Sequence, residues 1–166
     1  MSVAPGRSRR LVTARLTLVP QTVDAARALL AGGDAGLPLA QGYPHADSLD
    51  GLRLVVDHAF DDEELGGWFI ILAGSGELIG DCGTKGGTDE RGRVEIGYGV
   101  AAPFRGRGYG GEAVGAMVAW LGSQPGTRAV TAEVEVGNLA SRRLLERLGF
   151  GIEDTVDGCW WLVLPV

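Results

Sequence analysis

The segment best suited to chemistry is a glycine-rich run, Arg105–Gly111, with four glycines in seven residues. A strand-like run, residues 93–100, precedes it, and a helical run, residues 112–121, follows it. The first N–H groups of a helix have no partner within the helix, and the helix dipole adds about half a positive charge there. A glycine loop between a strand and a helix N-terminus therefore predicts an anion cradle, most often for phosphate.

The spacing of these residues narrows the choice of phosphate ligand. A nucleoside-triphosphate loop needs Gly-x-x-x-x-Gly-Lys-Ser/Thr, and no Lys-Ser or Lys-Thr follows the glycines here. The run Arg105-x-x-Gly108-x-Gly110 instead resembles the Arg/Gln-x-x-Gly-x-Gly/Ala signature of the GNAT acyltransferases, which hold the pyrophosphate of coenzyme A. Taken alone, the same glycines also fit a flexible loop.

Three further stretches carry the same resemblance. Residues 138–150 match Asn-x-x-Ser-x-x-x-Leu-x-x-x-Gly-Phe, a helix of that superfamily. Glu95-Ile96-Gly97-Tyr98 and the opening strand, residues 11–20, are similar to the branch that acetylates ribosomal-protein N-termini (RimJ/RimL-like). The resemblance covers residues 11–164, and it is strong over 93–150 and weak over 31–65.

This resemblance implies an acetyl-CoA-dependent N-acetyltransferase. It would transfer acetyl by direct attack of a primary amine, either a protein N-terminus or a small-molecule amine, with acetyl-CoA as cosubstrate and no metal. The implied fold is a mixed, mostly antiparallel α/β (α+β) sheet of about six to seven strands, with helices on both faces and a splayed V between the central strands. The implied coenzyme A contacts are Gly99, Val100, Arg105, Gly106, Arg107, Gly108, Tyr109, Gly110, Gly111, Asn138 and Ser141.

The resemblance also suggests catalytic roles. An alkylammonium has a pKa near 10, so its deprotonation needs a base or a relay water, and Glu95 is the candidate. The Gly99 and Val100 N–H groups would bind the thioester carbonyl. Many relatives place a tyrosine in the last helix as the acid. This chain has none there, and Ser141 matches the serine that hydrogen-bonds the leaving sulfur.

Each of these residues also has a purely structural interpretation. Glu95 fits an exposed or salt-bridged strand residue, and Arg105 and Arg107 fit a solvent-facing loop. Asn138 fits a helix N-cap, which is compatible with a pantetheine contact. His45 and His58 are expected to be a loop residue and a helix residue rather than catalysts.

The elements that must position these residues follow from apolar periodicity. The first half predicts strands at 16–20, 68–72 and 77–84, and a helix that Thr22 caps. Asp47 or Ser48 is expected to cap a second helix, whose inward residues would be Leu49, Leu52, Val56 and Phe60.

The second half alternates strands and helices. Strands are predicted at 93–100, 129–136, 150–156 and 159–164, and Gly149 is expected to end the last helix. The helix after the glycine loop has a core stripe of Val114, Met117, Val118 and Leu121. A meander followed by alternating strands and helices predicts a mixed α/β sheet with helices on both faces.

Composition limits the partners. At 166 residues the chain is expected to be one domain, residues 11–166, behind a flexible tail of residues 1–10. A net charge of −6 disfavours nucleic acid as a partner, and no apolar run approaches the ~20 residues that span a bilayer. The chain is therefore expected in the cytoplasm, with Cys82 and Cys159 as buried free thiols. The oligomeric state, monomer or homodimer, stays open.

Acidic residues concentrate between positions 47 and 64, where Arg53 alone opposes them. Such a run fits a solvated helix face, or a surface that attracts a cationic amine. The acidic members are Asp47, Asp50, Asp57, Asp61, Asp62, Glu63 and Glu64.

Two other functions remain open beside the acetyltransferase. One is an acyl-CoA-binding sensor or pseudoenzyme without turnover, which the presence of both Glu95 and Ser141 disfavours. The other is an acetyltransferase that acts on charged transfer RNA, which the acidic balance disfavours.

Overall fold

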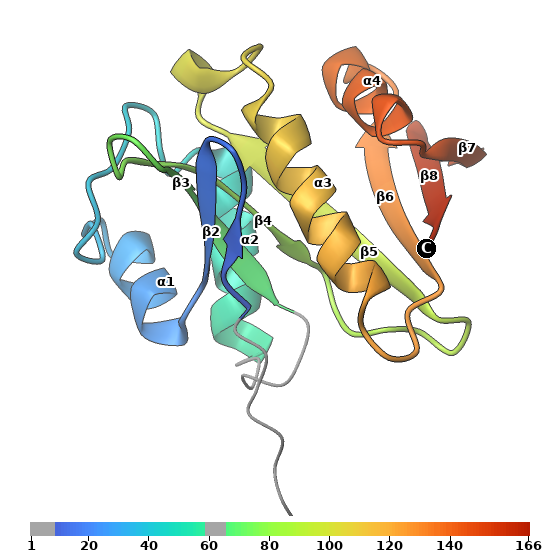
Figure 1. Cartoon of the computed structure of the whole chain (residues 1–166), viewed down its shortest axis with the longest axis horizontal. Coiled ribbons are helices and arrows are strands. Elements are labelled where there is room, and N and C mark those ends of the chain that lie inside the picture. The colour runs from blue at the N-terminus through green and yellow to red at the C-terminus, as the bar shows by residue number, and fades with distance from the viewer. Residues whose placement is uncertain (1–8, 59–65) are drawn as a thin grey trace, which may run out of the picture.

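The strands of this chain form one sheet in the order β1-β2-β3-β4-β5-β6-β8-β7 (Figure 1). The computed structural model describes residues 9–58 and 66–166. All neighbouring strands pair antiparallel except β5 and β6, which are parallel. The strands are β1 (Leu11–Val12), β2 (Leu16–Pro20), β3 (Gly67–Leu72), β4 (Leu78–Thr84), β5 (Arg93–Val100), β6 (Ala129–Glu135), β7 (Gly151–Val156) and β8 (Cys159–Pro165).

These strands confirm the predicted mixed α/β sheet. The strand beyond the expected six to seven is β1, which has two residues.

The last helix, α4 (Leu139–Arg147), starts after Asn138, whose Oδ1 accepts the Ser141 N–H at 3.1 Å. Asn138 is thus a helix N-cap.

Helices α1 (Val23–Leu30) and α2 (Ala46–His58) cover one face of the sheet. Thr22 caps α1 as predicted, because its Oγ1 accepts the Ala25 N–H at 3.1 Å. The prediction that Asp47 or Ser48 caps α2 is wrong. The helix begins at Ala46, and His45 Nδ1 accepts the Ser48 N–H at 3.2 Å.

The buried face of α2 also differs from the predicted one. The fully or nearly buried residues of this helix are Ser48, Leu52 and Val55. Leu49 and Val56 are therefore only partly buried, and the predicted inward Phe60 lies outside the described residues. A polar residue, Ser48, occupies a core position that the apolar pattern could not reveal.

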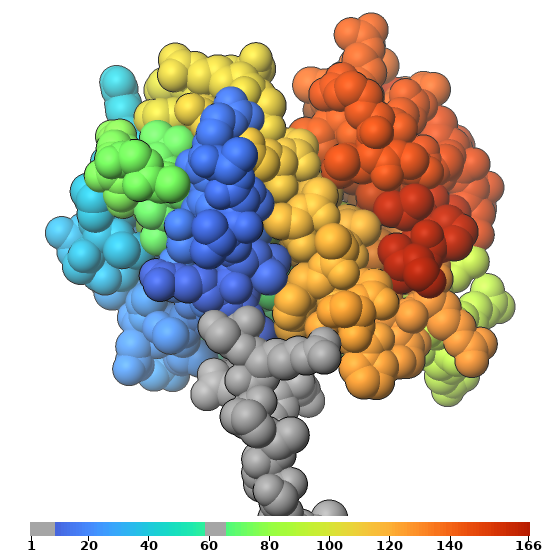
Figure 2. Space-filling view, viewed as in Figure 1, coloured from blue at the N-terminus to red at the C-terminus, as the bar shows by residue number. Residues whose placement is uncertain are grey.

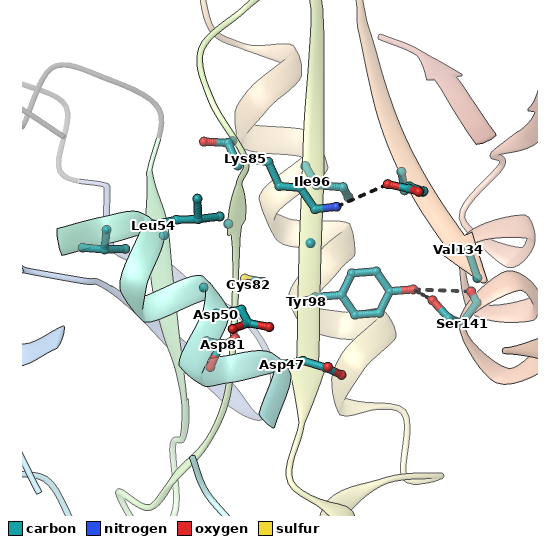
Figure 3. A pocket seen from close by; sticks show the side chains of 18 of the residues that line it. Asp47, Asp50, Leu54, Asp81, Cys82, Lys85, Ile96, Tyr98, Val134 and Ser141 are labelled. Carbon is teal, nitrogen blue, oxygen red and sulfur yellow. Dashed lines mark hydrogen bonds and ion pairs between the residues drawn. The ribbon is translucent and has the colours of Figure 1, made fainter. Parts of the chain in front are cut away.

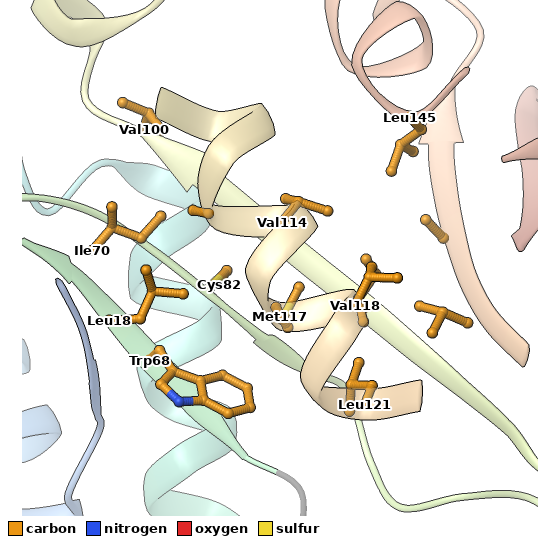
Figure 4. Packing of buried hydrophobic residues seen from close by; sticks show 14 of the residues in the cluster. Leu18, Trp68, Ile70, Cys82, Val100, Val114, Met117, Val118, Leu121 and Leu145 are labelled. Atoms are coloured by element: carbon orange, nitrogen blue, oxygen red, sulfur yellow. The ribbon is translucent and has the colours of Figure 1, made fainter. Parts of the chain in front are cut away.

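Helix α3 (Tyr109–Gly122) covers the opposite face and confirms the predicted core stripe. Val114, Met117 and Leu121 are fully buried, and Val118 is 8% exposed. Figure 4 shows this stripe facing the side chains of β2, β3 and β4, among them Trp68. Burying a side chain of this size stabilises a fold by about 1.5–3 kcal/mol, so this face anchors the strand and the loop that lead into α3.

The amino-terminal end of the described chain packs against β3. The Arg9 guanidinium lies over the Trp68 ring, 5.2 Å from its centroid, and donates to the Gly67 carbonyl at 3.3 Å. Of the predicted tail, residues 1–8 lie outside the described residues. Among the described helices, none is long and apolar enough to cross a membrane.

Candidate active site

The central feature of the sheet is the point where β5 and β6 separate. Their parallel pairing runs from Arg93–Ala129 to Glu95–Thr131 and then stops. Both strands continue, β5 to Val100 and β6 to Glu135. The strands therefore splay into the V that the resemblance implied, which opens backbone groups that a closed sheet would pair.

A cavity of about 500 Å³ lies at this V, with walls from β4, β5, β6, α2 and α4 (Figure 3). Its acidic wall residues are Asp47, Asp50, Asp81, Glu133 and Glu135, against one ammonium, Lys85. Ser141, Asn138 and Tyr98 line it as well. The cavity thus joins a cation-attracting wall to the predicted site of the leaving sulfur.

The hydrogen-bond ladder shows which β5 backbone groups face the gap. Ala101 N–H donates to Ile79 O at 2.7 Å, and Lys85 N–H donates to Glu95 O at 2.9 Å, so the odd-numbered residues bond to β4. Backbone groups of successive strand residues point to opposite sides. Of the two predicted carbonyl-binding groups, the Val100 N–H therefore faces the gap, whereas Gly99 is paired with Asp81 of β4.

The glycine loop begins directly after β5. A 3₁₀ turn (Ala102–Phe104) leads into Gly106 and Gly108, which have φ values of +72° and +83°. These left-handed conformations favour glycine and turn the chain into α3, whose N-cap is Gly108. The Arg105 Nε donates to the Val100 carbonyl at 2.7 Å, which fixes the loop to the end of β5.

The backbone N–H groups of residues 106–111 have no hydrogen-bond acceptor among the residues that the structure describes. A Cβ at Gly106 would meet no atom within 4 Å, so the space beside this residue is open. In the space-filling view a notch separates this loop from α4 (Figure 2). Free donors at a helix N-terminus beside an open notch fit a pyrophosphate.

The first hairpin of the chain holds this loop in place. Glu112, in the first turn of α3, accepts from Thr13 Oγ1 at 2.6 Å and from Arg15 Nε at 2.7 Å. Arg15 also donates to the Arg107 carbonyl at 2.9 Å and lies over the Tyr109 ring. These contacts rigidify the loop from behind and leave its N–H groups free.

Not every glycine of the motif faces the notch. A Cβ at Gly110 would lie 3.1 Å from Leu144 Cδ1, and one at Gly111 would lie 3.9 Å from Leu144 Cγ. Gly110 therefore lets α4 pack closely on the start of α3, whereas a Cβ at Gly111 would make an ordinary van der Waals contact. The Arg107 guanidinium lies 5.6 Å from the centroid of the Phe104 ring.

Helix α4 brings Ser141 to the opposite side of the cavity. Asn138 holds the Ser141 backbone, as described above, and the Tyr98 hydroxyl lies 2.5 Å from Ser141 Oγ. Tyr98 comes from β5 and reaches across the V to α4, as Figure 3 shows. Burial raises the pKa of Tyr98 and its hydrogen bond to Ser141 lowers it, with a net upward shift, so the phenol stays protonated at neutral pH.

A buried polar cluster lies behind the acidic wall. Tyr43 Oη donates to Asp81 Oδ2 at 2.9 Å, and Ser48 Oγ contacts His45 Nδ1. Burial raises the pKa of Asp81, and its hydrogen bonds to Ser48 and Tyr43 offset this only in part. Gly99 makes room for His45, because a Cβ at Gly99 would collide with the imidazole.

Glu95, the predicted base, lies where β5 and β6 are still paired. Its Oε1 is 2.7 Å from Lys85 Nζ, and its side chain is 30% exposed. Glu95 lines a second cavity of about 510 Å³, together with Trp161 and Glu153. Lys85 lines both cavities, so it separates Glu95 from the cavity that Ser141 lines.

The structure thus places Val100 and the glycine loop at the end of β5, Asn138 and Ser141 on the cavity wall, and Glu95 behind Lys85. Sequence reasoning missed the contact of Tyr98 with Ser141, although Tyr98 belongs to the quoted Glu-Ile-Gly-Tyr motif. It also missed Asp81, whose signal is a carboxylate inside the apolar strand β4. Asp61, Asp62, Glu63 and Glu64 of the acidic run lie outside the described residues.

The two cysteines differ in their surroundings. Both are free thiols, but only Cys82 is buried, and Cys159 is half-buried on the cavity wall. The prediction of a buried Cys159 is wrong, because this residue lines the cavity. Within residues 9–58 and 66–166, no group of three or more His, Cys, Asp or Glu could hold a metal ion.

Comparison with known proteins agrees with this geometry. The GNAT acetyltransferase domain model matches residues 15–151. The uncharacterized N-acetyltransferase YjdG of Bacillus subtilis is 36% identical over 83 residues, 50% of this chain and 49% of YjdG. The match to this curated relative thus spans about half of its length.

Two solved structures share the fold over nearly the whole chain. A Vibrio cholerae protein assigned as a ribosomal-protein-serine acetyltransferase has a TM-score of 0.67 at 18% identity, covering 95% of this chain and 97% of that one. The aminoglycoside acetyltransferase AAC(6')-Ib, solved with coenzyme A, has a TM-score of 0.65 at 21% identity, covering 90% and 94%. By its domain match, its splayed sheet and its glycine loop, the chain belongs to the GNAT acetyltransferase family.

Proposed function

We propose that this protein transfers the acetyl group of acetyl-CoA to a primary amine. One observation carries the proposal. The glycine loop follows the end of β5, where the Val100 N–H faces the gap, and Ser141 lines the cavity at the opening between β5 and β6. An acyl thioester that carries a pyrophosphate needs hydrogen-bond donors in this arrangement.

The loop would hold the pyrophosphate, and the Val100 N–H would bind the thioester carbonyl. Acetyl-CoA supplies the activated acyl group when bound. Ser141, whose backbone Asn138 fixes, would hydrogen-bond the sulfur that leaves. Preorganised donors of this kind are worth roughly 3–4 kcal/mol each in acyl transfer.

The amine would enter from the side of α2. The exposed carboxylates Asp47 and Asp50 line that side of the cavity, with the buried Asp81 behind them, and the negative charge of the exposed pair attracts an alkylammonium. Glu95 would take the proton that the amine must lose, through a water or after separation from Lys85. The acceptor itself, a protein N-terminus or a small-molecule amine, is selected in our proposal by the loops at residues 32–44 and 85–92.

The experiment that tests this function measures free thiol release from acetyl-CoA over a panel of peptides, polyamines, aminoglycosides and amino acids. Amine-dependent release supports the acetyltransferase. Binding of coenzyme A without release for any amine would instead support an acyl-CoA sensor. Absence of coenzyme A binding would overturn both.

A further inference from the structure

The contact between Tyr98 and Ser141 joins two elements that the splay pulls apart. Tyr98 stands on β5, and Ser141 stands on α4, 43 residues later in the chain. The Tyr98 hydroxyl lies 2.5 Å from Ser141 Oγ and 3.4 Å from the Ser141 carbonyl oxygen. Both residues line the cavity at the V (Figure 3).

This contact orients the Ser141 hydroxyl. The Ser141 N–H is already bound to Asn138 Oδ1 at 3.1 Å, so the backbone of the residue is fixed. With Tyr98 O–H donating to Ser141 Oγ, the proton of Ser141 is free to point into the cavity. A hydroxyl held in this way is ready to donate to a sulfur atom there.

The acidities of the groups involved show why Ser141 needs Tyr98 as a source of a second proton. The phenol of tyrosine has an ordinary pKa near 10 and a thiol one near 8.5, whereas an isolated serine hydroxyl is a far weaker acid. A proton given to a thiolate by serine alone would leave an alkoxide in the cavity. A phenol in direct contact can refill the serine oxygen as its proton leaves.

We propose that Tyr98 is a positioning residue that acts through Ser141 as a proton relay, and this inference rests on the proposed acetyl transfer. As the carbon–sulfur bond breaks, the Ser141 proton moves to the sulfur and the Tyr98 proton moves to Ser141 Oγ. Glu95 takes the proton that converts the alkylammonium to the amine, and the Tyr98 oxygen regains its proton from the nitrogen, through water in the cavity, once the nitrogen–carbon bond has formed. Nitrogen thus loses two protons, one to Glu95 and one that replaces the proton passed to sulfur, so the exchange balances without another reagent.

The kinetic test compares Tyr98→Phe, Ser141→Ala and the double variant with the wild-type protein. Tyr98→Phe keeps the ring and removes the hydroxyl, so kcat should fall about 10- to 100-fold while the KM for acetyl-CoA stays unchanged. Because the two groups act in series, the double variant should be no slower than Ser141→Ala. Losses that multiply in the double variant would overturn the relay.

A second readout needs no turnover. Carbon-13 NMR of labelled tyrosine can follow the Tyr98 phenol in the protein without acetyl-CoA, with Tyr109 as the internal reference. The bond to Ser141 lowers the pKa of Tyr98, so Ser141→Ala should raise it. An unchanged Tyr98 titration would show that the contact is absent in solution and would overturn the proposal.

The outcomes separate this inference from the function on which it rests. If wild-type protein releases thiol and Tyr98→Phe matches it, the relay fails and the acetyltransferase stands. If wild-type protein releases no thiol with any amine, the proposed function fails, and the relay fails with it. Loss of activity in Tyr98→Phe together with a lower melting temperature and a raised KM would indicate a structural role and would also overturn the relay.

Discussion

Lys85 and Glu95 form an ion pair, with 2.7 Å between Nζ and Oε1, at the last paired rung before β5 and β6 separate. Lys85 Nζ also lies 4.0 Å from Glu133 of β6. The ammonium thus neutralises carboxylates from both arms of the V. It also stands between the predicted base and the cavity of the acceptor amine.

Variants of the two members of this ion pair distinguish a catalytic role of Glu95 from a structural one. If Glu95 acts on the amine, Glu95→Gln should lower kcat by about 100-fold and change the KM for acetyl-CoA little. The loss should be largest at low pH, where the amine is most protonated. Steady-state kinetics from pH 6 to 9, a proposed assay range, measure it.

Lys85→Met provides the matched control, since it removes the same ion pair and keeps the Glu95 carboxylate. We expect this variant to retain or exceed the wild-type kcat. Equal behaviour of both variants, with full activity and the same small loss of stability, would make Glu95 a structural residue.

The contacts of Glu112 predict a pH-dependent stability. Burial opposes ionisation of Glu112, but the hydrogen bonds from Thr13 and Arg15 outweigh it and lower the pKa. A carboxyl group whose pKa is lowered in the folded protein stabilises the fold at pH values above its ordinary pKa. It loses that stabilisation as the pH falls through its pKa in the folded protein. Glu112→Gln should therefore cost about 1–2 kcal/mol at pH 7 and much less below about pH 4.

Urea unfolding of wild-type and Glu112→Gln protein across pH 3 to 7, a proposed range, measures this difference. A difference in unfolding free energy between the two proteins that stays constant with pH would contradict this prediction. Because Glu112 also braces the loop, the variant should bind coenzyme A more weakly at neutral pH.

For Asp81 we expect the opposite dependence of stability on pH. Burial raises its pKa, so the folded protein binds this proton more tightly, and ionisation destabilises the fold as pH rises above the ordinary value of an aspartate. Asp81→Asn keeps an oxygen acceptor for the Tyr43 hydroxyl. Its stability relative to wild type should increase from pH 4 upward, which unfolding curves at several pH values can follow.

If Asp81 also attracts the amine, Asp81→Asn should raise the KM for the amine by about tenfold and leave the KM for acetyl-CoA unchanged. A more stable variant that binds the amine as well as wild type would show that Asp81 serves no role in acceptor binding. A stability difference between Asp81→Asn and wild type that does not change with pH would contradict the raised pKa.

The sequence carried enough information to predict most elements, because their apolar periodicity is strong. The β5 strand occupies the predicted residues 93–100, and α3 buries the predicted stripe. Helix α2 was harder to predict, since its cap is an imidazole and its buried face includes the hydroxyl of Ser48. Neither feature appears in an apolar pattern.

The glycine loop shows a different limit of prediction from the sequence. Residues 106–111 also satisfy Gly-x-Gly-x-x-Gly, the spacing of a dinucleotide loop, and β5-α3-β6 is a parallel crossover. Only the rest of the sheet excludes a doubly wound dinucleotide fold, because every other strand pair is antiparallel. The local motif needed the long-range topology for its interpretation.

Side-chain contacts between elements far apart in the chain could not be predicted from sequence spacing. Tyr98 and Ser141 are 43 residues apart, and Arg15 and Glu112 are 97 residues apart. Both contacts depend on the relative positions of elements that pack through the core. The predicted roles of Glu95 and Ser141 stay predictions until the variants are measured.

The central claim is that the free N–H groups of the glycine loop bind the pyrophosphate of coenzyme A. Gly106→Val and Gly158→Val form a matched pair for its test. Both glycines have a left-handed φ, +72° and +78°, and a Cβ at either would meet no protein atom within 4 Å. The two variants therefore carry similar backbone strain, but only the first intrudes on the loop.

Isothermal calorimetry with coenzyme A and with pantetheine, which lacks the pyrophosphate, gives the decisive comparison. We expect Gly106→Val to weaken coenzyme A binding at least about tenfold, a cost of about 1.4 kcal/mol, and to leave pantetheine binding unchanged. Gly158→Val should bind both ligands like wild type. Wild-type affinity of folded Gly106→Val for coenzyme A would contradict the account.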